Sequence, residues 1–193
     1  MNDPGEDRYS KREWRTRLLS ARRLVPSAQR AEEANALATV VDSIQGDPVC
    51  CYLPVGTEPG SLAMVTALAG RRILLPVVTG AAPLDWAVYD GALVDGPFGL
   101  REPNGPRLGP LAIEQAALVL VPALAVDRFG TRLGRGGGHY DRSLPLARPG
   151  TPLVAVVRDD EVVDELPAEA HDVRMTGVLT PNGGFRPLGG QTM

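Results

Sequence analysis

Apolar residues follow a helical spacing up to about residue 48. Two amphipathic helices are predicted there, over residues 8–24 and 27–44. Pro26 ends the first helix, and Ser27 is a suitable N-cap for the second. Their apolar faces consist of Trp14, Leu18 and Leu19 in the first helix and of Ala31, Ala34, Leu37, Ala38 and Val41 in the second.

Beyond residue 48, short apolar runs alternate with helical and loop segments, a pattern typical of buried strands. The predicted strands are 49–53, 72–78, 84–89, 118–122 with a continuation through 126, 153–157 and, as the last, 177–180. Helices are predicted over 62–68 and at the end of 135–146, and residues 97–110 are predicted to be rich in loops. This order predicts an α/β fold: one Rossmann-like, three-layer domain over residues 1–193, with a mostly parallel sheet covered by helices on both faces.

Charge and composition exclude several classes of protein. The formal net charge is −3, whereas a general nucleic-acid binder needs a basic face that displaces counterions. The polar N-terminus lacks the apolar core of a signal peptide, and no apolar run is long enough to cross a bilayer. Cys50 and Cys51 are neighbours that point to opposite faces of a strand, so we expect buried free thiols in a reducing compartment. These features favour a cytoplasmic protein without nucleic-acid or membrane partners.

Residues 121–144 carry the clearest chemical pattern: a strand, a turn, a glycine cluster and a helix. The glycines that free the backbone to approach a ligand are Gly134, Gly136, Gly137 and Gly138. Amides of such a loop form an anion site with Arg132 and Arg135, and Asp141 is placed where a carboxylate can hold the Mg²⁺ of a nucleotide. The alternative is a tight turn that leads into a helix, and the spacing is neither a Walker A loop nor G-x-G-x-x-G. The residues alone therefore indicate a phosphate site.

This segment also carries a resemblance to a known family. RLGRGGGHYDRSL resembles the signature of the 5-formyltetrahydrofolate cyclo-ligase family, usually RLGRGKGYYDRFL, in which the loop wraps the phosphates of ATP. Further stretches resemble family motifs in the family's order: YLPVGTE at 52–58, LDWAVYD followed by FGLREP at 98–103, and LPAEAHDVRMTGVLT at 166–180. The resemblance covers most of the chain beyond the first helix.

The resemblance implies an ATP site, a folate site and a Mg²⁺ site. The implied ATP-binding residues are Lys11, Arg15, Arg132, Leu133, Gly134, Arg135, Gly136, Gly137, Gly138, His139 and Tyr140. The implied folate-binding residues are Leu53, Glu58 and Trp86, the Mg²⁺ ligands are Asp141 and Asp172, and the catalytic residues are Arg135 and Tyr140.

The implied reaction closes 5-formyltetrahydrofolate to 5,10-methenyltetrahydrofolate. The formyl oxygen attacks the γ-phosphate of MgATP, and N10 then closes the ring of the phosphorylated imidate as phosphate leaves. Such a reaction needs mainly positioning and charge neutralisation, so no nucleophilic side chain is expected. The expected partners are the two small-molecule substrates, ATP and 5-formyltetrahydrofolate, and we expect a monomer.

Several of these residues also have a simpler, structural interpretation. Lys11 and Arg15 are spaced so that they share one helix face, which can equally be a solvated basic face. Glu58 can interact with the dipole of a following helix, and Trp86 can fill the core. The remaining alternatives are a capping or salt-bridging role for Asp141 and Asp172 and a structural hydrogen bond for His171.

Three positions depart from the family's pattern. Gly137 replaces the loop lysine, His139 replaces the first tyrosine of YYD, and Glu161 replaces a glutamine. His139, Arg132 or Arg142 can supply the missing charge. The departures leave two other functions open: a paralogue of the same fold that acts on another folate-like substrate, and a non-catalytic folate- or nucleotide-binding protein.

Overall fold

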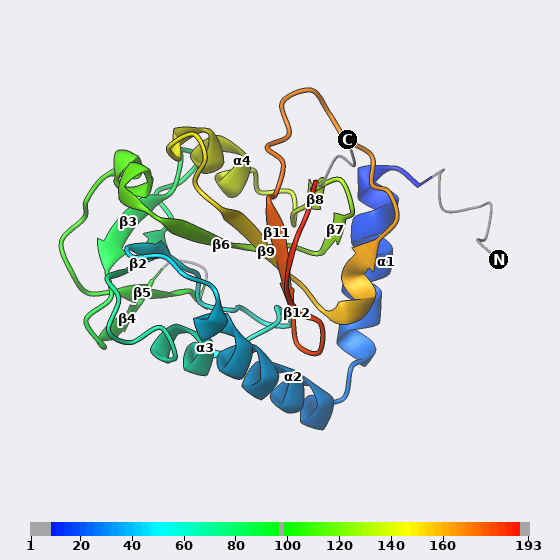
Figure 1. Cartoon of the computed structure of the whole chain (residues 1–193), viewed down its shortest axis with the longest axis horizontal. Helices are drawn as coiled ribbons and strands as arrows, with labels where there is room; N and C mark the ends of the chain where they lie inside the picture. The colour runs from blue at the N-terminus through cyan, green and yellow to red at the C-terminus, as the bar shows by residue number, and fades with distance from the viewer. Residues whose placement is uncertain (1–8, 97–98, 190–193) are drawn as a thin grey trace.

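The computed structural model describes residues 9–96 and 99–189, which contain a seven-stranded sheet in the order β12-β11-β9-β6-β1-β2-β3 (Figure 1). The strands are β1 (Val49–Cys50), β2 (Ile73–Val77), β3 (Asp85–Val88), β6 (Leu118–Pro122), β9 (Leu153–Val156), β11 (Gly177–Thr180) and β12 (Gly184–Pro187). β3 and β12 pair antiparallel at the edges, and the strands between them are parallel. The five parallel strands, in chain order, are β1, β2, β6, β9 and β11. Across the sheet they are arranged as second, first, third, fourth and fifth, so the direction of the order reverses between β1 and β6.

Helical segments cover both faces of this sheet, as predicted. One face packs against α2 (Ser27–Val40), the 3₁₀ turn η2 (Val41–Ser43) and α3 (Leu62–Thr66). The other packs against η4 (Pro110–Gln115), α4 (His139–Ser143) and η5 (Leu144–Leu146). Figure 1 shows α2 and α3 below the sheet and α4 above it. Cys50 and Cys51 are buried free thiols in the cores on opposite faces, as the alternation of a strand requires.

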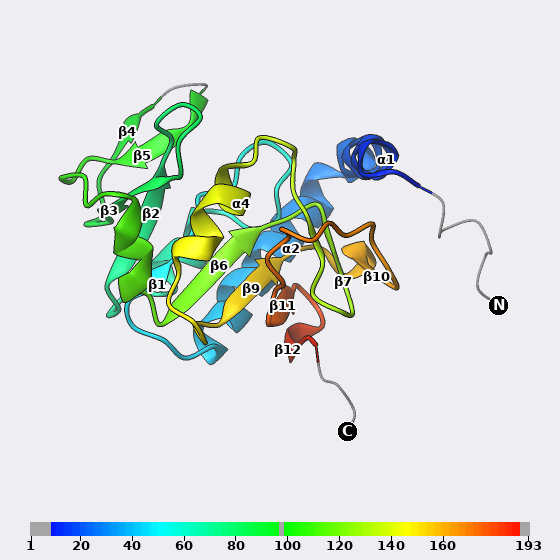
Figure 2. The same ribbon diagram turned by 90° about the horizontal axis from the view of Figure 1, so that it is seen from above.

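The helix α1 (Lys11–Leu24) packs elsewhere, against a small sheet with the strand order β10-β7-β8. Its strands are β7 (Ala125–Asp127), β8 (Arg132–Leu133) and β10 (Val162–Val163), the last preceded by the 3₁₀ turn η6 (Asp159–Glu161). Trp14 and Leu18 of α1 are buried against Leu124 and Leu133. Figure 2 shows α1 at the opposite end of the molecule from the hairpin β4 (Leu93–Asp95) and β5 (Arg101–Pro103).

The predicted helices are confirmed, with changes at their ends. Ser10 caps α1 in a capping box with Glu13, because each side chain accepts a hydrogen bond from the other residue's amide. The predicted start of this helix at Arg8 lies outside the described residues. Ser27 as an N-cap was wrong: the cap position is Pro26, whose extended backbone precedes a helix that begins at Ser27 itself.

The strand predictions failed mainly at the edges of the sheets. The chain leaves the large sheet at Pro122, so 125–127 belongs to the small sheet and does not continue β6. The segment 177–180 is not the last strand, because the exposed β12 pairs with it as an antiparallel edge. The region 97–110, which was expected to be loop, contains β5, and this strand pairs with β4. Phe98, which belongs to a predicted family motif in this region, lies outside the described residues. In the part of the chain that is described, no helix has both the length and the apolar character needed to cross a bilayer.

Candidate active site

A cavity of about 240 Å³ lies at the carboxyl ends of β1 and β6. Tyr52 and Leu53, which follow β1, line it together with Pro122 and Ala123 at the end of β6. Doubly wound sheets bind ligands where the strand order reverses, and β1 and β6 flank that point. Residues 134–138, the glycine loop, line another side of the same cavity. The fold thus gathers the segment after β1 and the glycine loop around one space.

Two glycines of the glycine loop have backbone conformations that side chains disfavour. Gly136 has φ +101° and Gly138, which precedes α4, has φ +68°. A Cβ atom on Gly138 would lie 2.6 Å from Nη1 of Arg142, whose Nη2 donates to the Gly137 carbonyl at 3.0 Å. Gly137 itself has an ordinary φ, and its Cβ would meet only His139. The shape of the loop therefore depends on Gly136 and Gly138, while position 137 accepts other residues.

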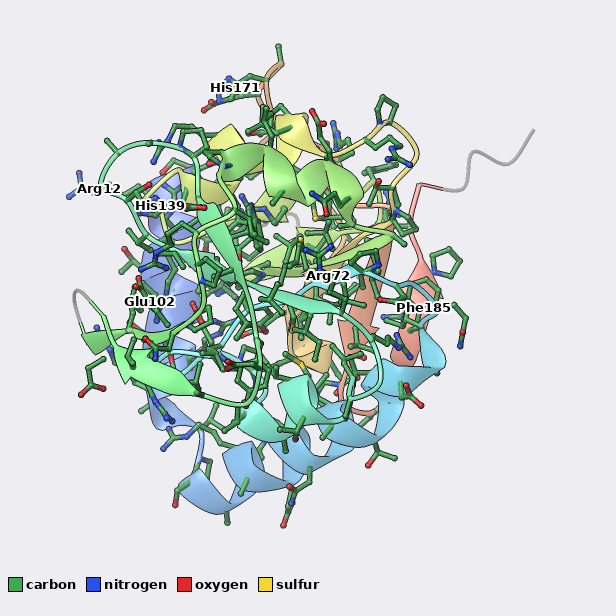
Figure 3. All side chains as sticks on the ribbon, turned by 90° about the vertical axis from the view of Figure 1, so that its left-hand side faces the viewer. Arg12, Arg72, Glu102, His139, His171 and Phe185 are labelled. Atoms are coloured by element: carbon green, nitrogen blue, oxygen red, sulfur yellow. The ribbon has the colours of Figure 1, made fainter. Side chains whose placement is uncertain are left out.

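The two basic residues at the start of α1 both have partners in other parts of the chain. Nε of Arg15 donates to the Gly134 carbonyl at 2.9 Å. Nζ of Lys11 lies 2.9 Å from a carboxylate oxygen of Asp172 and 3.4 Å from Glu169. Arg12, between them in sequence, is exposed and projects away from the body of the protein (Figure 3). The structure therefore brings Arg15 to the predicted phosphate loop, whereas Lys11 contacts the segment around Asp172 and does not line the cavity.

The arginines flanking the glycine loop are both paired with acids. Arg132 forms an ion pair with Asp141, and its Nη1 donates to the Pro122 carbonyl at 3.3 Å. Burial lowers the pKa of Arg132, and the neighbouring Asp141 opposes this shift. Arg135 is more exposed, and its Nη1 lies 3.5 Å from Oε1 of Glu58. Of these two arginines, Arg135 is therefore the one that a ligand in the cavity reaches with less desolvation.

Glu58 joins the two sides of the cavity. It is largely buried, accepts a hydrogen bond from the Val55 amide at 2.9 Å and lines the cavity with Leu53. Burial raises the pKa of Glu58, and the Val55 amide and Arg135 oppose the shift. The helix-dipole interpretation does not fit, because α3 begins at Leu62 and has its own cap, Ser61.

Two predicted ligand-binding side chains do not reach the cavity. Trp86 is completely buried in the core and is not among the cavity's lining residues, so its predicted contact with folate was wrong and the core interpretation holds. Leu133 is also buried, packing with Trp14 and Leu18 of α1, because alternate residues of a strand point to opposite sides. Its side chain therefore supports α1 instead of contacting a nucleotide.

Asp141 forms an ion pair with Arg132, which precedes the glycine loop, and Asp172 forms one with Lys11 at the start of α1. Partial burial raises the pKa of Asp172, but the Glu169 amide and Lys11 outweigh it, so the net shift is downward. Ligand atoms of Asp172, Glu169 and His171 lie within 4.8 Å of one another, a group that does not include Asp141. His171 is mostly exposed at the tip of its loop, 3.2 Å from Glu169 (Figure 3).

The sequence interpretation missed part of the buried side of the cavity, its floor, which is formed by Arg22, Tyr52 and Tyr140. Arg22 and Tyr52 line the cavity and are almost fully buried, and Glu161 binds Arg22. The signal for Arg22 was present, because it follows Trp14 and Leu18 at the four-residue spacing of the buried face of α1. Tyr140, which was predicted, lies here too, and its hydroxyl oxygen is buried without a hydrogen-bond partner in the described part of the chain.

Comparison with known proteins identifies the family. The model of the 5-formyltetrahydrofolate cyclo-ligase family matches residues 7–181. The chain belongs to this family. It is 52% identical over 189 residues to the 5-formyltetrahydrofolate cyclo-ligase of Mycolicibacterium smegmatis, covering 93% of this chain and 97% of that protein. The 5-formyltetrahydrofolate cyclo-ligase of Escherichia coli K12 is 29% identical over 171 residues, covering 83% and 94%.

Solved structures agree with this cyclo-ligase assignment. The NMR structure of Aquifex aeolicus 5,10-methenyltetrahydrofolate synthetase matches with a TM-score of 0.78 and 27% identity, covering 95% of each chain. A 5,10-methenyltetrahydrofolate synthetase from Mycoplasma pneumoniae shares the fold, with a TM-score of 0.69 at 17% identity over 88% of this chain and 98% of that one. The predicted family and fold class are thus confirmed, and the protein is an enzyme of the ligase class.

Proposed function

We propose that the protein catalyses the ATP- and Mg²⁺-dependent cyclisation of 5-formyltetrahydrofolate to 5,10-methenyltetrahydrofolate, with release of ADP and phosphate. The observation that carries the proposal is the single cavity that contains both the glycine loop and Glu58. A phosphate donor on the loop and a folate beside Glu58 would therefore meet in one space. Membership of the cyclo-ligase family supports this choice of substrates.

The nucleotide would lie on the glycine loop. Arg135 and Arg15 supply positive charge there, and Lys11 would add to it on leaving Asp172; phosphoryl transfer depends mainly on such charge and on positioning. Asp141 and Asp172 would hold Mg²⁺, since carboxylate oxygens suit this ion, and the ion would neutralise phosphate charge. Their present partners, Arg132 and Lys11, would then be free to turn toward the phosphates.

The folate would lie between Leu53, Glu58 and the floor. Its formyl oxygen attacks the γ-phosphorus of ATP, and ADP leaves. N10 then attacks the formyl carbon of the phosphorylated imidate, loses its proton, and phosphate departs with the former formyl oxygen. Burial raises the pKa of Tyr140 well above its usual value, so its hydroxyl stays protonated and would donate a hydrogen bond to a reacting oxygen.

An absorbance assay tests this proposal directly. The protein is mixed with 5-formyltetrahydrofolate, ATP and Mg²⁺, and formation of methenyltetrahydrofolate is followed beside formation of ADP. Methenyl product in equal amount to ADP, dependent on both ATP and Mg²⁺, is the expected result. Folded protein that binds ATP but forms no methenyl product would contradict the proposal, and tight folate binding without ADP formation would favour a binding protein.

Gly137 and His139 line the cavity, so two of the three departures from the family pattern fall where substrates would bind. This placement favours, as the second candidate, an enzyme of the same fold that acts on another folate-like substrate. A panel of folates at equal concentration separates the two, because the proposed activity requires the highest kcat/KM for 5-formyltetrahydrofolate. We also propose that the enzyme is cytoplasmic, which its buried free thiols support and which cell fractionation would test, and that it is a monomer, which light scattering would test.

A further inference from the structure

Arg22 is a charged residue on the buried face of a helix. It follows Trp14 and Leu18 on α1 and is only 2% exposed. Burying a guanidinium without partners is strongly unfavourable, so its surroundings must supply acceptors. Arg22 also lines the cavity of the candidate active site, next to Tyr52 and Ala123.

A buried carboxylate holds Arg22 in one orientation. Nε of Arg22 lies 2.6 Å from Oε1 of Glu161, and Nη2 lies 2.8 Å from Oε2 and 2.7 Å from the Ala123 carbonyl. Glu161 is 3% exposed and also accepts a hydrogen bond from the Arg158 amide at 2.8 Å. The pair is therefore neutral overall and fixed at both ends, and its two-point geometry sets the plane of the guanidinium.

One nitrogen of this guanidinium, Nη1, is engaged neither by Glu161 nor by Ala123. Nη1 of Arg22 is buried and has no hydrogen-bond partner among residues 9–96 and 99–189. The same is true of the Tyr140 hydroxyl, which lines the same cavity. Buried polar atoms are nearly always paired in folded proteins, and an unpaired one is destabilising. An acceptor on a ligand would satisfy Nη1 without disturbing the pair with Glu161.

The neighbouring Glu58 indicates which ligand edge fits. Glu58 offers an acceptor to the cavity, and Arg22 offers a donor that cannot accept. The pyrimidine edge of a tetrahydropterin has the matching order: donors at the 2-amino group and N3, followed by an acceptor at the 4-oxo oxygen. Burial raises the pKa of Glu58, and Arg22 is among the charges that oppose the shift, so the two groups lie within electrostatic reach.

We propose that Arg22 is a specificity-determining residue, which donates from Nη1 to the 4-oxo oxygen of the pterin ring while Glu58 accepts from the adjacent N–H groups. This inference rests on the proposed function, because it assigns an orientation to the folate in that cavity. Glu161 is then a positioning residue that aims Arg22. The positive charge is already neutralised, so the interaction selects for an acceptor at this position more than for a negative ligand.

The test pairs protein variants with two ligands in calorimetric binding assays without ATP. One ligand is 5-formyltetrahydrofolate, and the other is its 4-amino analogue, which lacks both the 4-oxo acceptor and the N3–H donor. The wild-type protein should bind the 4-oxo ligand at least about 10-fold more tightly, as expected for one buried hydrogen bond. In Arg22→Met/Glu161→Gln, which removes the donor without leaving an unpaired charge, this preference should fall about 10-fold from its wild-type value, and the remainder comes from the N3–H contact with Glu58.

Two further variants keep the test decisive. Arg22→Lys retains a cation for Glu161 but lacks the second donor arm, so it should fold normally and lose the preference in the same way. Arg23→Met, which removes the exposed neighbouring arginine, should keep the wild-type preference. If folded Arg22→Lys keeps the preference, or if both ligands weaken equally, Arg22 does not read the 4-oxo group. If the wild-type protein nevertheless forms methenyl product, the proposed function still holds. If folded wild-type protein binds neither folate, both proposals are wrong.

Discussion

The glycine-loop end of the cavity and its floor balance positive charge in different ways. At the loop end, Arg135 is 44% exposed in its side chain and makes one contact of 3.5 Å with Glu58. On the floor, the side chain of Arg22 is 1% exposed and is held by Glu161 through two short contacts and by a backbone carbonyl. Both ends contain an arginine paired with a glutamate, yet only the first can exchange this partner for a ligand at a small cost in free energy.

The loop end is therefore suited to binding a negatively charged ligand, whereas the floor is suited to selecting a ligand with an acceptor in a set position. Weak, hydrated ion pairs contribute little to stability, so a polyanion can replace their carboxylates. A desolvated and fully paired arginine stays in place and presents a donor in a set direction. We therefore expect changes at the loop end to alter nucleotide use, and changes on the floor to alter stability and folate selection.

The largest expected effect comes from breaking the floor pair on one side. Glu161→Ala leaves the Arg22 charge buried without its carboxylate, so the free energy of unfolding should fall by about 3–5 kcal/mol. Urea unfolding followed by circular dichroism measures this. Arg22→Met/Glu161→Gln is the control, because removing both charges should recover most of the loss, and equal destabilisation of the two proteins would refute the comparison.

At the loop end, Arg135→Ala should leave stability nearly unchanged but lower kcat about 100-fold. The reason is the loss of charge stabilisation in the transition state, on the order of 3 kcal/mol. Single-turnover measurements of methenyl product give the rate of the chemical step. A near-wild-type single-turnover rate would remove Arg135 from the mechanism.

A matched pair of variants on α1 separates the loop-facing side from the solvent side. Arg15→Ala removes the side chain that binds the Gly134 carbonyl, and ATP affinity should weaken about 10-fold. Arg12→Ala removes an exposed arginine three residues earlier and should change ATP affinity by less than about twofold. Calorimetric titration with ATP compares them, and equal losses would mean that only net charge matters.

Glu58 connects the two ends and should give folate binding a pH dependence. Because burial raises the pKa of Glu58, its carboxylate becomes an acceptor only as the pH rises through that higher value. Folate affinity should therefore increase with pH, by up to about 10-fold per pH unit below the pKa. Stability runs the opposite way, since the unfolded chain releases this proton at lower pH than the folded chain does. KM for folate measured against pH tests this, and Glu58→Gln should flatten the profile.

The smallest expected effect concerns the absent loop lysine. Gly137 has an ordinary φ, and a Cβ there would lie 3.1 Å from Cδ2 of His139, which must shift by a few tenths of an ångström. Gly137→Lys should lower KM for ATP by a few-fold, because it adds a point charge to the loop where Arg142 is already engaged by the Gly137 carbonyl and His139. Gly138→Lys is the contrasting variant: its positive φ and the close Arg142 should make it harmful. An equal response of the two variants would contradict this account of the loop.

The sequence predicted the parts of the fold that depend on local periodicity. The central strands are continuous apolar runs, and the helices have one apolar face, so both were recognisable. The edge strand β12 has little apolar pattern, since most of its residues are exposed, and β4–β5 is equally short and partly exposed. Pairing with a neighbour, rather than burial, defines such strands.

For the site, the glycine loop was predictable because its residues are adjacent in sequence. Arg22 and Glu161 are separated by 139 positions, so their pairing depends on how α1 packs against η6. Leu133 and Trp86 show the opposite error. Each lies in a recognisable motif, but the direction of its side chain depends on the pairing of its strand, which places both in the core.

The two adjacent cysteines give the protein a practical property. Burial raises the pKa of Cys51 to about 12, and burial together with the nearby Cys51 raises that of Cys50 further still. Both thiols therefore stay protonated and shielded at neutral pH, where maleimide dyes require an accessible thiolate. The chain has only these two cysteines, so a cysteine introduced at the exposed Arg12 would take up a fluorophore selectively. Such a label would report on α1 as nucleotide and folate bind, without first replacing the two native cysteines.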